Sequence, residues 1–266
     1  RRMGVTSSST LPEYLAYVYE NPDEAHVLRR EFLIGVSKFF RDSAAFEIME
    51  KKVVNDLVEN TPAGEPLKVW SVGCSTGEEA YSLAILFREC LLKKKKNLLV
   101  KIFATDIEKN NLEIASSGIY LQNIEADVSS KRLKTFFTKD GAYYKVKPEI
   151  RSMVVFSNHN ILTDPPFYKL NLVCCRNVLI YLEPEIQKKV LAIAHYSLNL
   201  DGYMFLGPSE TIGDFKPFFE EIDRKWKFYK NKKPANSIGF QHAVRLPDIS
   251  KGDESRPGPG SGKWNV

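Results

Sequence analysis

The alternation of apolar and polar positions divides the chain into a helical beginning and a longer part in which short apolar runs alternate with amphipathic segments. In the first part, apolar side chains at helical spacing predict helices that start after Thr10, over residues 23–34 and at Asp42. Thr10, Pro12 and Glu13 have the arrangement of a capping box, and Asp42 is expected to cap the third helix. Residues 1–60 therefore form a predicted N-terminal helical domain.

A linker-like segment, residues 60–66, leads into the second part. The pattern predicts strands at 67–72, 98–105, 152–157, 170–175, 202–206 and 225–229, with helices at 77–92, 108–117 and 184–198. This alternation predicts an α/β fold, with a mostly parallel sheet covered by helices on both faces, over residues 61–230. Residues 231–266 are rich in Pro, Gly, Ser and charge, which predicts a linker or disordered tail.

Composition narrows the classes of function. Of the 266 residues 43% are hydrophobic, mean hydropathy is −0.28, and the longest apolar runs are too short for a membrane span. A net charge of +5 permits an acidic partner without demanding nucleic acid. Cys74, Cys90, Cys174 and Cys175 lack zinc-site spacing, so we expect reduced thiols, and the four scattered histidines do not indicate a metal.

The segment VWSVGCSTGEE, residues 69–79, combines a strand, a glycine turn and the start of a helix. Gly73 would allow a ligand to approach the backbone closely at the carboxyl end of the strand. The spacing is neither that of a dinucleotide fingerprint nor that of a P-loop. Glu78 and Glu79 at the helix start would repel a phosphate, so the motif favours a neutral or cationic ligand such as S-adenosylmethionine.

Further polar residues follow the other predicted strands and are expected on the same edge of the sheet. Asp106 ends the second strand and is either an acceptor for ribose hydroxyls or a helix N-cap. His159 is more readily explained by a structural hydrogen bond than by catalysis. Arg176 and Asn177 directly follow a buried strand, where Asn177 is either a turn residue or part of a ligand pocket.

Five segments resemble the CheR-type chemotaxis receptor methyltransferases, in the same order from about residue 11 to 230: FFR at 39–41, residues 70–82, ATDI at 104–107, SGIY at 117–120 and CRNVLIY at 175–181. The resemblance implies a Rossmann-like, S-adenosylmethionine-dependent methyltransferase sheet, a small N-terminal helical domain of which only the second half is present, and a small β-subdomain near 133–151. It implies methyl transfer to glutamate side chains on the cytoplasmic helical bundle of chemoreceptors, which leaves S-adenosylhomocysteine.

The resemblance also assigns roles to residues of this chain. Arg41 and Tyr181 are the expected catalytic residues, because Arg41 would grip the incoming carboxylate and Tyr181 would orient it near the methyl group. For Arg41 the other reading is a surface ion pair or a contact with Asp42 at the helix start. The expected cofactor-binding residues are Gly35, Ser37 and Arg41 from the helical domain, Gly73, Glu79 for the methionine or adenosine part, Asp106 for the ribose, Asn160 and Ile161 for the adenine, and Arg176 and Asn177 near the sulfonium. The family commonly has Asn where this chain has Gly35.

Alternatives remain beside this hypothesis. The chain could be an S-adenosylmethionine-binding signalling module with a lost or different methyl acceptor, a methyltransferase for small molecules or nucleic acid, or a nucleotide dehydrogenase, which the glutamates at 78 and 79 disfavour. The stretch 136–144 is shorter than the hairpin with which some family members dock on a receptor tether, so we expect tether independence. We further expect a cytoplasmic protein without membrane insertion or nucleic-acid binding. The start without Met suggests possible fused signalling domains.

Overall fold

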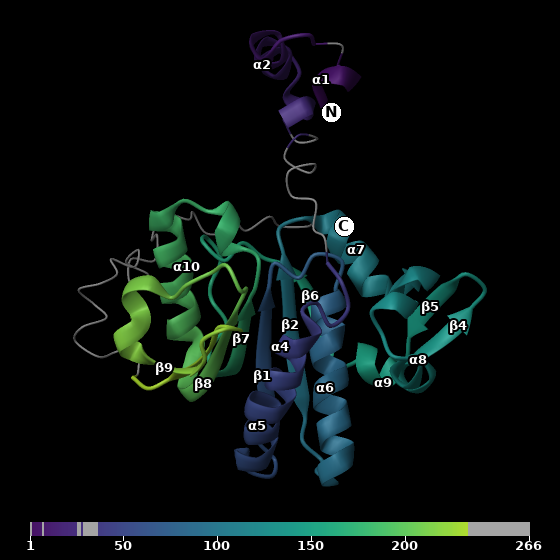
Figure 1. Ribbon diagram of the computed structural model, residues 1–266, viewed down its shortest axis with the longest axis vertical. Helices are drawn as coiled ribbons and strands as arrows, with labels where there is room; N and C mark the ends of the chain where they lie inside the picture. The colour runs from purple at the N-terminus through teal and green to yellow at the C-terminus, as the bar shows by residue number, and fades with distance from the viewer. Residues whose placement is uncertain (1, 7, 26–27, 29–36, 234–266) are drawn as a thin grey trace, which may run out of the picture.

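The computed structural model describes residues 2–6, 8–25, 28 and 37–233, and a seven-stranded sheet forms the centre of this part (Figure 1). Five neighbouring strands are parallel and lie in the order β6 (Val154–Asn158), β2 (Val100–Asp106), β1 (Leu67–Val72), β7 (Leu170–Cys175) and β8 (Leu198–Leu206). The strand order reverses between β1 and β7, the switch point at which doubly wound folds bind ligands. The predicted Rossmann-like α/β fold class is confirmed, and β1 and β7 have the predicted bounds.

The far end of the sheet differs from the prediction of a single strand at 225–229. A hairpin of β9 (Phe219–Asp223) and β10 (Phe228–Asn231) pairs antiparallel with β8. Residues 224–227 are the turn between these strands, with Lys227 in the left-handed region at φ 56°. The sequence pattern missed β9 because this edge strand carries Glu220 and Glu221, which are exposed and give it little apolar character.

Helices cover both faces of the sheet. On one face α6 (Glu78–Lys94) packs against an unbroken helical stretch made of α4 (Ser43–Ile48), the π-helical turn η1 (Met49–Val54) and α5 (Asn55–Asn60), while α7 (Lys109–Ser117) adds Leu112. On the other face lie α10 (Pro184–Ser197) and the 3-10 helix η4 (Gly213–Phe218). Neighbouring side chains of β1 serve both faces, since Val69 joins the first cluster and Trp70 the second.

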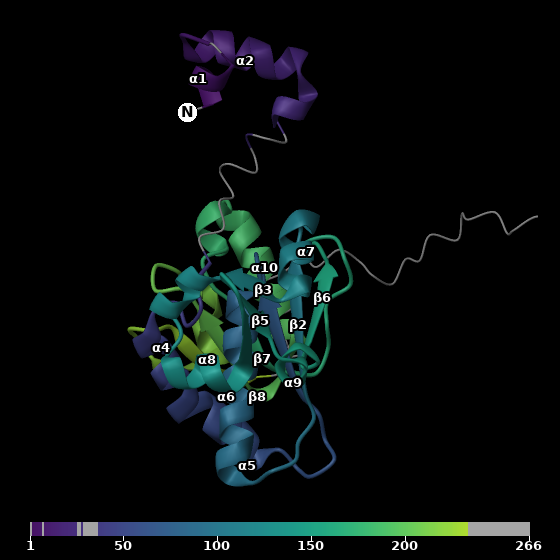
Figure 2. The same ribbon diagram turned by 90° about the vertical axis from the view of Figure 1, so that its right-hand side faces the viewer.

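The N-terminal helices α1 (Arg2–Val5) and α2 (Leu11–Glu20) stand apart from the sheet in both views (Figures 1 and 2). The predicted cap of α2 is confirmed, because the Thr10 hydroxyl accepts a hydrogen bond from the Glu13 backbone N–H at 3.4 Å. The predicted helix over 23–34 falls mostly outside the described residues. Buried side chains between Phe39 and Val58 belong to the same hydrophobic cluster as β1 and α6, whereas the division of domains at residue 60 stays a prediction.

A second, small sheet follows α7. Its three antiparallel strands lie in the order β3 (Ile119–Leu121), β5 (Tyr143–Val146) and β4 (Phe137–Asp140), accompanied by η2 (Gln122–Ala126), α8 (Ser130–Phe136) and α9 (Pro148–Arg151). The Phe39 ring packs edge-on against Tyr120 and Phe137, with centroid distances of 4.9 and 5.5 Å. These aromatic contacts attach the small sheet to the segment that precedes α4.

The second glycine of the G-x-x-x-G motif is required where α6 starts. Gly77 has a φ of +95°, and a Cβ atom at this position would lie 2.9 Å from the Ala115 Cβ and 3.1 Å from the Tyr120 hydroxyl. The missing side chain therefore permits both the left-handed backbone and the close approach of α7 to α6.

We predict that Gly77→Ala lowers the free energy of unfolding by about 3 kcal/mol, since backbone strain and crowding add. The matched control is Gly64→Ala, which has a φ of +89° but no atom within 4 Å of its added Cβ, and should lose only about 1 kcal/mol. Urea unfolding followed by circular dichroism measures both. Equal losses in the two variants would contradict the packing role.

Candidate active site

A cavity of about 350 Å³ opens at the carboxyl edge of the parallel strands, beside the switch point. All the cofactor-binding and catalytic residues expected from the sequence line it, apart from Gly35, which lies outside the described residues. They are Ser37, Arg41, Gly73, Glu79, Asp106, Asn160, Ile161, Arg176, Asn177 and Tyr181. Further lining residues that the sequence analysis did not single out include Lys38, Phe46, Asn111 and Val178. The volume is within the range of about 300–1,000 Å³ that is usual for small-molecule sites.

The loop after β1 forms the floor of the cavity. Gly73 has a φ of +64°, and a Cβ there would lie 2.7 Å from the Val178 Cγ2 atom, so glycine is needed on steric and conformational grounds. The Cys74 backbone N–H donates to the Thr105 carbonyl at 2.9 Å. This bond holds the loop against the end of β2.

Asp106 connects this loop with the start of α7. One carboxylate oxygen accepts from the Ser75 backbone N–H at 2.8 Å, and the other accepts from the Glu108 N–H at 2.9 Å. Burial raises the pKa of the Asp106 carboxyl, although the backbone hydrogen bonds oppose this shift. The helix N-cap reading is wrong, because Glu108 occupies the N-cap position of α7. The carboxylate lines the cavity while it orders the loops on either side.

The two glutamates at the start of α6 have different surroundings. Glu79 lines the cavity and accepts a hydrogen bond from the Ser71 hydroxyl at 2.8 Å, whereas Glu78 accepts from the Thr76 hydroxyl. Burial raises the pKa of Glu79, and the nearby Arg176 guanidinium partly offsets this effect. Of the two carboxylates, only that of Glu79 is placed to meet a ligand in this cavity.

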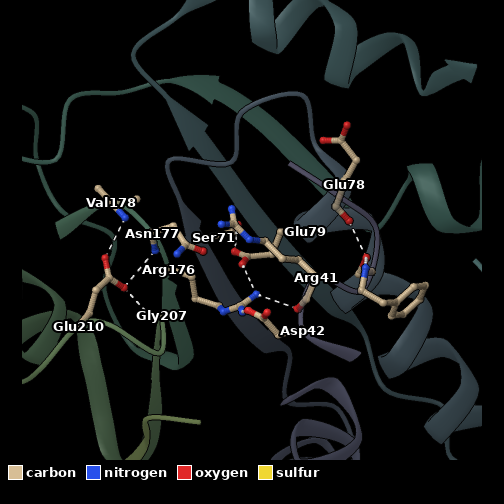
Figure 3. A network of polar contacts seen from close by, with 12 residues as sticks. Arg41, Asp42, Ser71, Glu78, Glu79, Arg176, Asn177, Val178, Gly207 and Glu210 are labelled. Atoms are coloured by element: carbon tan, nitrogen blue, oxygen red, sulfur yellow. Dashed lines mark hydrogen bonds and ion pairs between the residues drawn. The ribbon is translucent and has the colours of Figure 1, made fainter. Parts of the chain in front are cut away.

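Arg176 is the buried cation of the site, with a side chain only 2% exposed (Figure 3). One terminal nitrogen lies 2.6 Å from an Asp42 carboxylate oxygen, and the other lies 3.5 Å from Glu79 and 3.4 Å from the Arg41 carbonyl oxygen. The guanidinium also stacks over the Phe205 ring, 4.4 Å from its centroid. Arg176 therefore joins the end of β7 to the segment before α4.

This ion pair overturns the expected side-chain cap of the third helix. Asp42 occupies the N-cap position of α4, but its φ is +61° and its side chain makes no capping hydrogen bond. The carboxylate turns to Arg176 instead, because a buried guanidinium without a counter-charge would be far more costly than an uncapped N–H group.

The preceding residues are fixed as firmly. Phe40 has a φ of +50°, and its N–H donates at 2.9 Å to the Ser82 hydroxyl, which itself donates to the Glu78 carbonyl at 2.6 Å. Arg41 thus lies between two residues with left-handed backbone, Phe40, which α6 holds through Ser82, and Asp42, which Arg176 holds. This backbone geometry sets the position from which the half-buried Arg41 side chain lines the cavity.

The loop after β6 forms another wall. His159 hydrogen-bonds through Nε2 to the Pro165 carbonyl at 3.0 Å, the structural role that the sequence analysis favoured. The Asn160 N–H donates to the Asp164 carboxylate at 2.8 Å, and its side-chain oxygen accepts from the Leu162 N–H at 3.0 Å. These bonds fold the loop so that Asn160 and Ile161 both line the cavity.

Sequence reasoning missed Glu210, which follows β8 and is 4% exposed. Its carboxylate accepts hydrogen bonds from the backbone N–H groups of Asn177, Val178 and Leu179 at 2.8–3.0 Å, and from that of Gly207. Figure 3 shows Glu210 beside Asn177, Val178 and Gly207. An acidic residue shortly after a buried strand, on the edge already singled out, was the available signal. Asn177 itself has a φ of +57°, so it is both a turn residue and a cavity residue.

Two classes of feature are absent from the described part of the chain. No group of three or more His, Cys, Asp or Glu side chains there is arranged to hold a metal ion. Among the helices of residues 2–6, 8–25, 28 and 37–233, none has the length and apolar character needed to cross a membrane.

A doubly wound sheet with a cavity at its switch point, into which the carboxylates of Glu79 and Asp106 face, defines a Rossmann-like α/β domain with a small-molecule site. The model of the family described as "CheR methyltransferase, SAM binding domain" matches residues 35–228. The chain therefore belongs to the CheR methyltransferase family. The enzyme class and the cofactor expected from the resemblance, a methyltransferase and S-adenosylmethionine, are confirmed at the level of this family.

The chain is also similar to individual proteins and to solved structures. The chain is 42% identical over 234 residues to an uncharacterized 104.1 kDa protein of Rhodobacter capsulatus, covering 88% of this chain and 25% of that protein. It is 34% identical over 189 residues to the chemotaxis protein methyltransferase Cher2 of Pseudomonas putida, covering 69% of this chain and 68% of that protein. A TehB-like SAM-dependent methyltransferase structure from Corynebacterium glutamicum aligns with 81% of this chain and 99% of its own, at 14% identity and a TM-score of 0.41.

The ion pair between Arg176 and Asp42 leads to a stability prediction. Asp42→Asn should lower the free energy of unfolding by about 2 kcal/mol, because Arg176 would keep only the more distant Glu79 as a counter-charge. Asp201→Asn is the matched control, since Asp201 also has a left-handed φ of +60° but pairs with Lys232 while 57% exposed. The free energy of unfolding of this control should fall by less than about 1 kcal/mol in the same denaturant titration. Losses of equal size would show that the buried pair contributes no more than a surface one.

Proposed function

We propose that this chain transfers a methyl group from S-adenosylmethionine to glutamate side chains of chemoreceptor cytoplasmic domains. The observation that carries the proposal is that Arg41, whose backbone is held by Arg176 and by the hydrogen bond between Phe40 and Ser82, lines the same cavity as Tyr181. A guanidinium suits a carboxylate acceptor, whereas the carboxylates of Glu79 and Asp106 suit an ammonium group and hydroxyls. The family name and that of the Pseudomonas putida relative support a chemotaxis role.

The residues present fit the cofactor by the chemistry of their donors and acceptors. We assign Asp106 to the ribose hydroxyls and Glu79 to the methionine or adenosine part. The loop at Gly73 permits close approach of the ligand to the backbone. Asn160 and Ile161 would flank the adenine, Asn177 would lie near the sulfonium, and Ser37 and Arg41 would close over the ligand.

The role expected for Arg176, direct contact with the cofactor near the sulfonium, is replaced here by a supporting role. Arg176 lines the cavity, but both of its terminal nitrogens contact protein groups, namely Asp42, Glu79 and the Arg41 carbonyl. We therefore propose that Arg176 supports the cofactor site mainly by holding Arg41 and Glu79 in place.

The chemistry requires no general base from the chain. S-adenosylmethionine supplies an electrophilic methyl group, and a glutamate acceptor is already ionised near neutral pH because its pKa is about 4.3. Arg41 would bind the acceptor carboxylate in a bidentate manner, and the Tyr181 hydroxyl would fix its orientation. Exclusion of water by the cavity walls would favour the reaction, since opposite charges neutralise each other as it proceeds.

The role of Arg41 is testable by labelled methyl transfer. Arg41→Ala should leave the unfolding midpoint nearly unchanged and reduce transfer of radioactive methyl groups to receptor-containing membranes on the order of 100-fold. Arg41→Lys should recover little, because an ammonium cannot make the bidentate contact. The exposed Arg224→Ala controls for the loss of one positive charge.

Product chemistry separates the outcomes of this assay. Methyl esters of glutamate release methanol in alkali, whereas methylated nitrogen does not. Turnover by Arg41→Ala at the rate of the native chain would refute the role of Arg41. Binding of S-adenosylhomocysteine without any transfer by the native chain would favour the signalling module with a lost or different acceptor.

We also propose that the enzyme acts without a receptor tether. The β4–β5 hairpin is short: Asp140 pairs with Tyr143, which leaves only Gly141 and Ala142 in the turn. Family members that dock on a tether use a longer hairpin at this place. We propose fused signalling domains as partners, and the chain covers only 25% of the longer Rhodobacter capsulatus protein. A receptor target would imply a cytoplasmic location.

Titration calorimetry with a receptor C-terminal pentapeptide tests tether independence. We predict no saturable heat at peptide concentrations that saturate a family member with the longer hairpin, which serves as the positive control. Saturable binding by this chain would refute tether independence but would leave the methyl-transfer proposal intact.

A further inference from the structure

We infer that Glu210 is a positioning residue that fixes the segment Asn177–Tyr181 as one wall of the cofactor cavity. The inference rests on the proposed use of this cavity for the cofactor, but not on the identity of the methyl acceptor. Glu210 does not line the cavity. It would therefore affect a bound ligand only through the backbone of that segment.

The hydrogen bonds of Glu210 are divided evenly between its two oxygens. Oε1 accepts from the Val178 N–H at 2.9 Å and the Leu179 N–H at 2.8 Å, and Oε2 accepts from the Asn177 N–H at 3.0 Å and from Gly207. A carboxylate that is 4% exposed needs such partners to remain buried. The N–H groups need it equally, because those at the start of a helical turn have no acceptor within the turn.

The segment that these bonds hold carries three cavity residues. Asn177 adopts a left-handed φ of +57°, Val178 lies against the Gly73 loop, and Tyr181 ends the 3-10 helix η3 (Leu179–Tyr181). A shift of this backbone would therefore move the wall at Asn177 and the side chain at Tyr181 together. Glu210 thereby sets the spacing between the proposed cofactor and acceptor positions.

Gly207 packs closely against the Glu210 carboxylate and leaves no room for a side chain. A Cβ at Gly207 would lie 2.7 Å from the Glu210 Oε2 atom and 3.0 Å from the Asn177 backbone nitrogen. The φ of Gly207 lies outside the left-handed range, so what excludes a side chain there is the close approach of the carboxylate and the loop. Glycine at this position and glutamate three residues later act as one unit.

The first test is Glu210→Gln, which keeps the shape but places an NH₂ group opposite two N–H donors. We expect the Kd for S-adenosylhomocysteine, measured by calorimetry, to rise about tenfold, since unsatisfied buried donors weaken the arrangement by that order. In the transfer assay kcat should fall as well, because Tyr181 moves with the segment.

The matched control is Asn231→Ala. Asn231 is fully buried and bonds to the Asn199 carbonyl, the Lys233 N–H and His195, at the edge of the sheet opposite the cavity. It should lower the unfolding midpoint at least as much as Glu210→Gln and leave the Kd within twofold. A Kd for Glu210→Gln that matches the native chain would overturn the inference, as would an equal rise in both variants.

A second variant keeps the inference testable if Glu210→Gln does not fold. Gly207→Ala retains the carboxylate but pushes it from the loop, and should also raise the Kd about tenfold. Gly202→Ala is its control, because a Cβ there meets backbone oxygens of Asn199 and Leu170 at 3.0–3.1 Å, away from the cavity. Absence of binding by the native chain would instead refute the cofactor site itself, so the two failures are distinguishable.

Discussion

The site depends above all on the burial of one guanidinium. Arg176 is 2% exposed, and a cation in that position must find counter-charges within the fold. Glu79 provides one from α6 and Asp42 provides the other from the N-cap position of α4, and the Arg41 carbonyl adds a third acceptor. This requirement draws the segment before α4 onto the carboxyl edge of the sheet. Arg41 consequently lies beside the cavity instead of extending into solvent from a helix start.

Carboxylates perform a second task at this edge, where the loops lack the regular hydrogen bonds of strands. Asp106 accepts from the backbone of Ser75 and Glu108, and Glu210 accepts from four backbone N–H groups across two loops. Each links the ends of different strands. Asp106 thus both lines the cavity and holds its walls, whereas Glu210 holds a wall without lining the cavity.

Much of the fold could be predicted from the sequence, because the central strands β1 and β7 are short and almost entirely buried. The strands at 67–72 and 170–175 have the predicted bounds, and the alternation with helices led directly to the doubly wound sheet. The charged edge strand β9 escaped, since it lacks a fully apolar face. Asp106, Asn160 and Asn177 could be named because each lies at or just after the end of a strand, where parallel connections bring side chains to one edge. Ser37 and Arg41, which precede the first strand, were named from the family resemblance.

What the sequence determined by itself is therefore the set of elements, the sheet edge at which polar side chains gather, and the family to which the motifs belong. Which group each polar side chain contacts was decided only by the tertiary structure. Asp42 had the sequence context of a helix cap, yet it pairs with a residue 134 positions away. Glu210 had no recognisable motif and lies 31–33 positions from the loop it supports. A local sequence pattern indicates the preferred backbone conformation. The partner of a buried charge depends instead on which groups the folded chain brings within hydrogen-bonding distance.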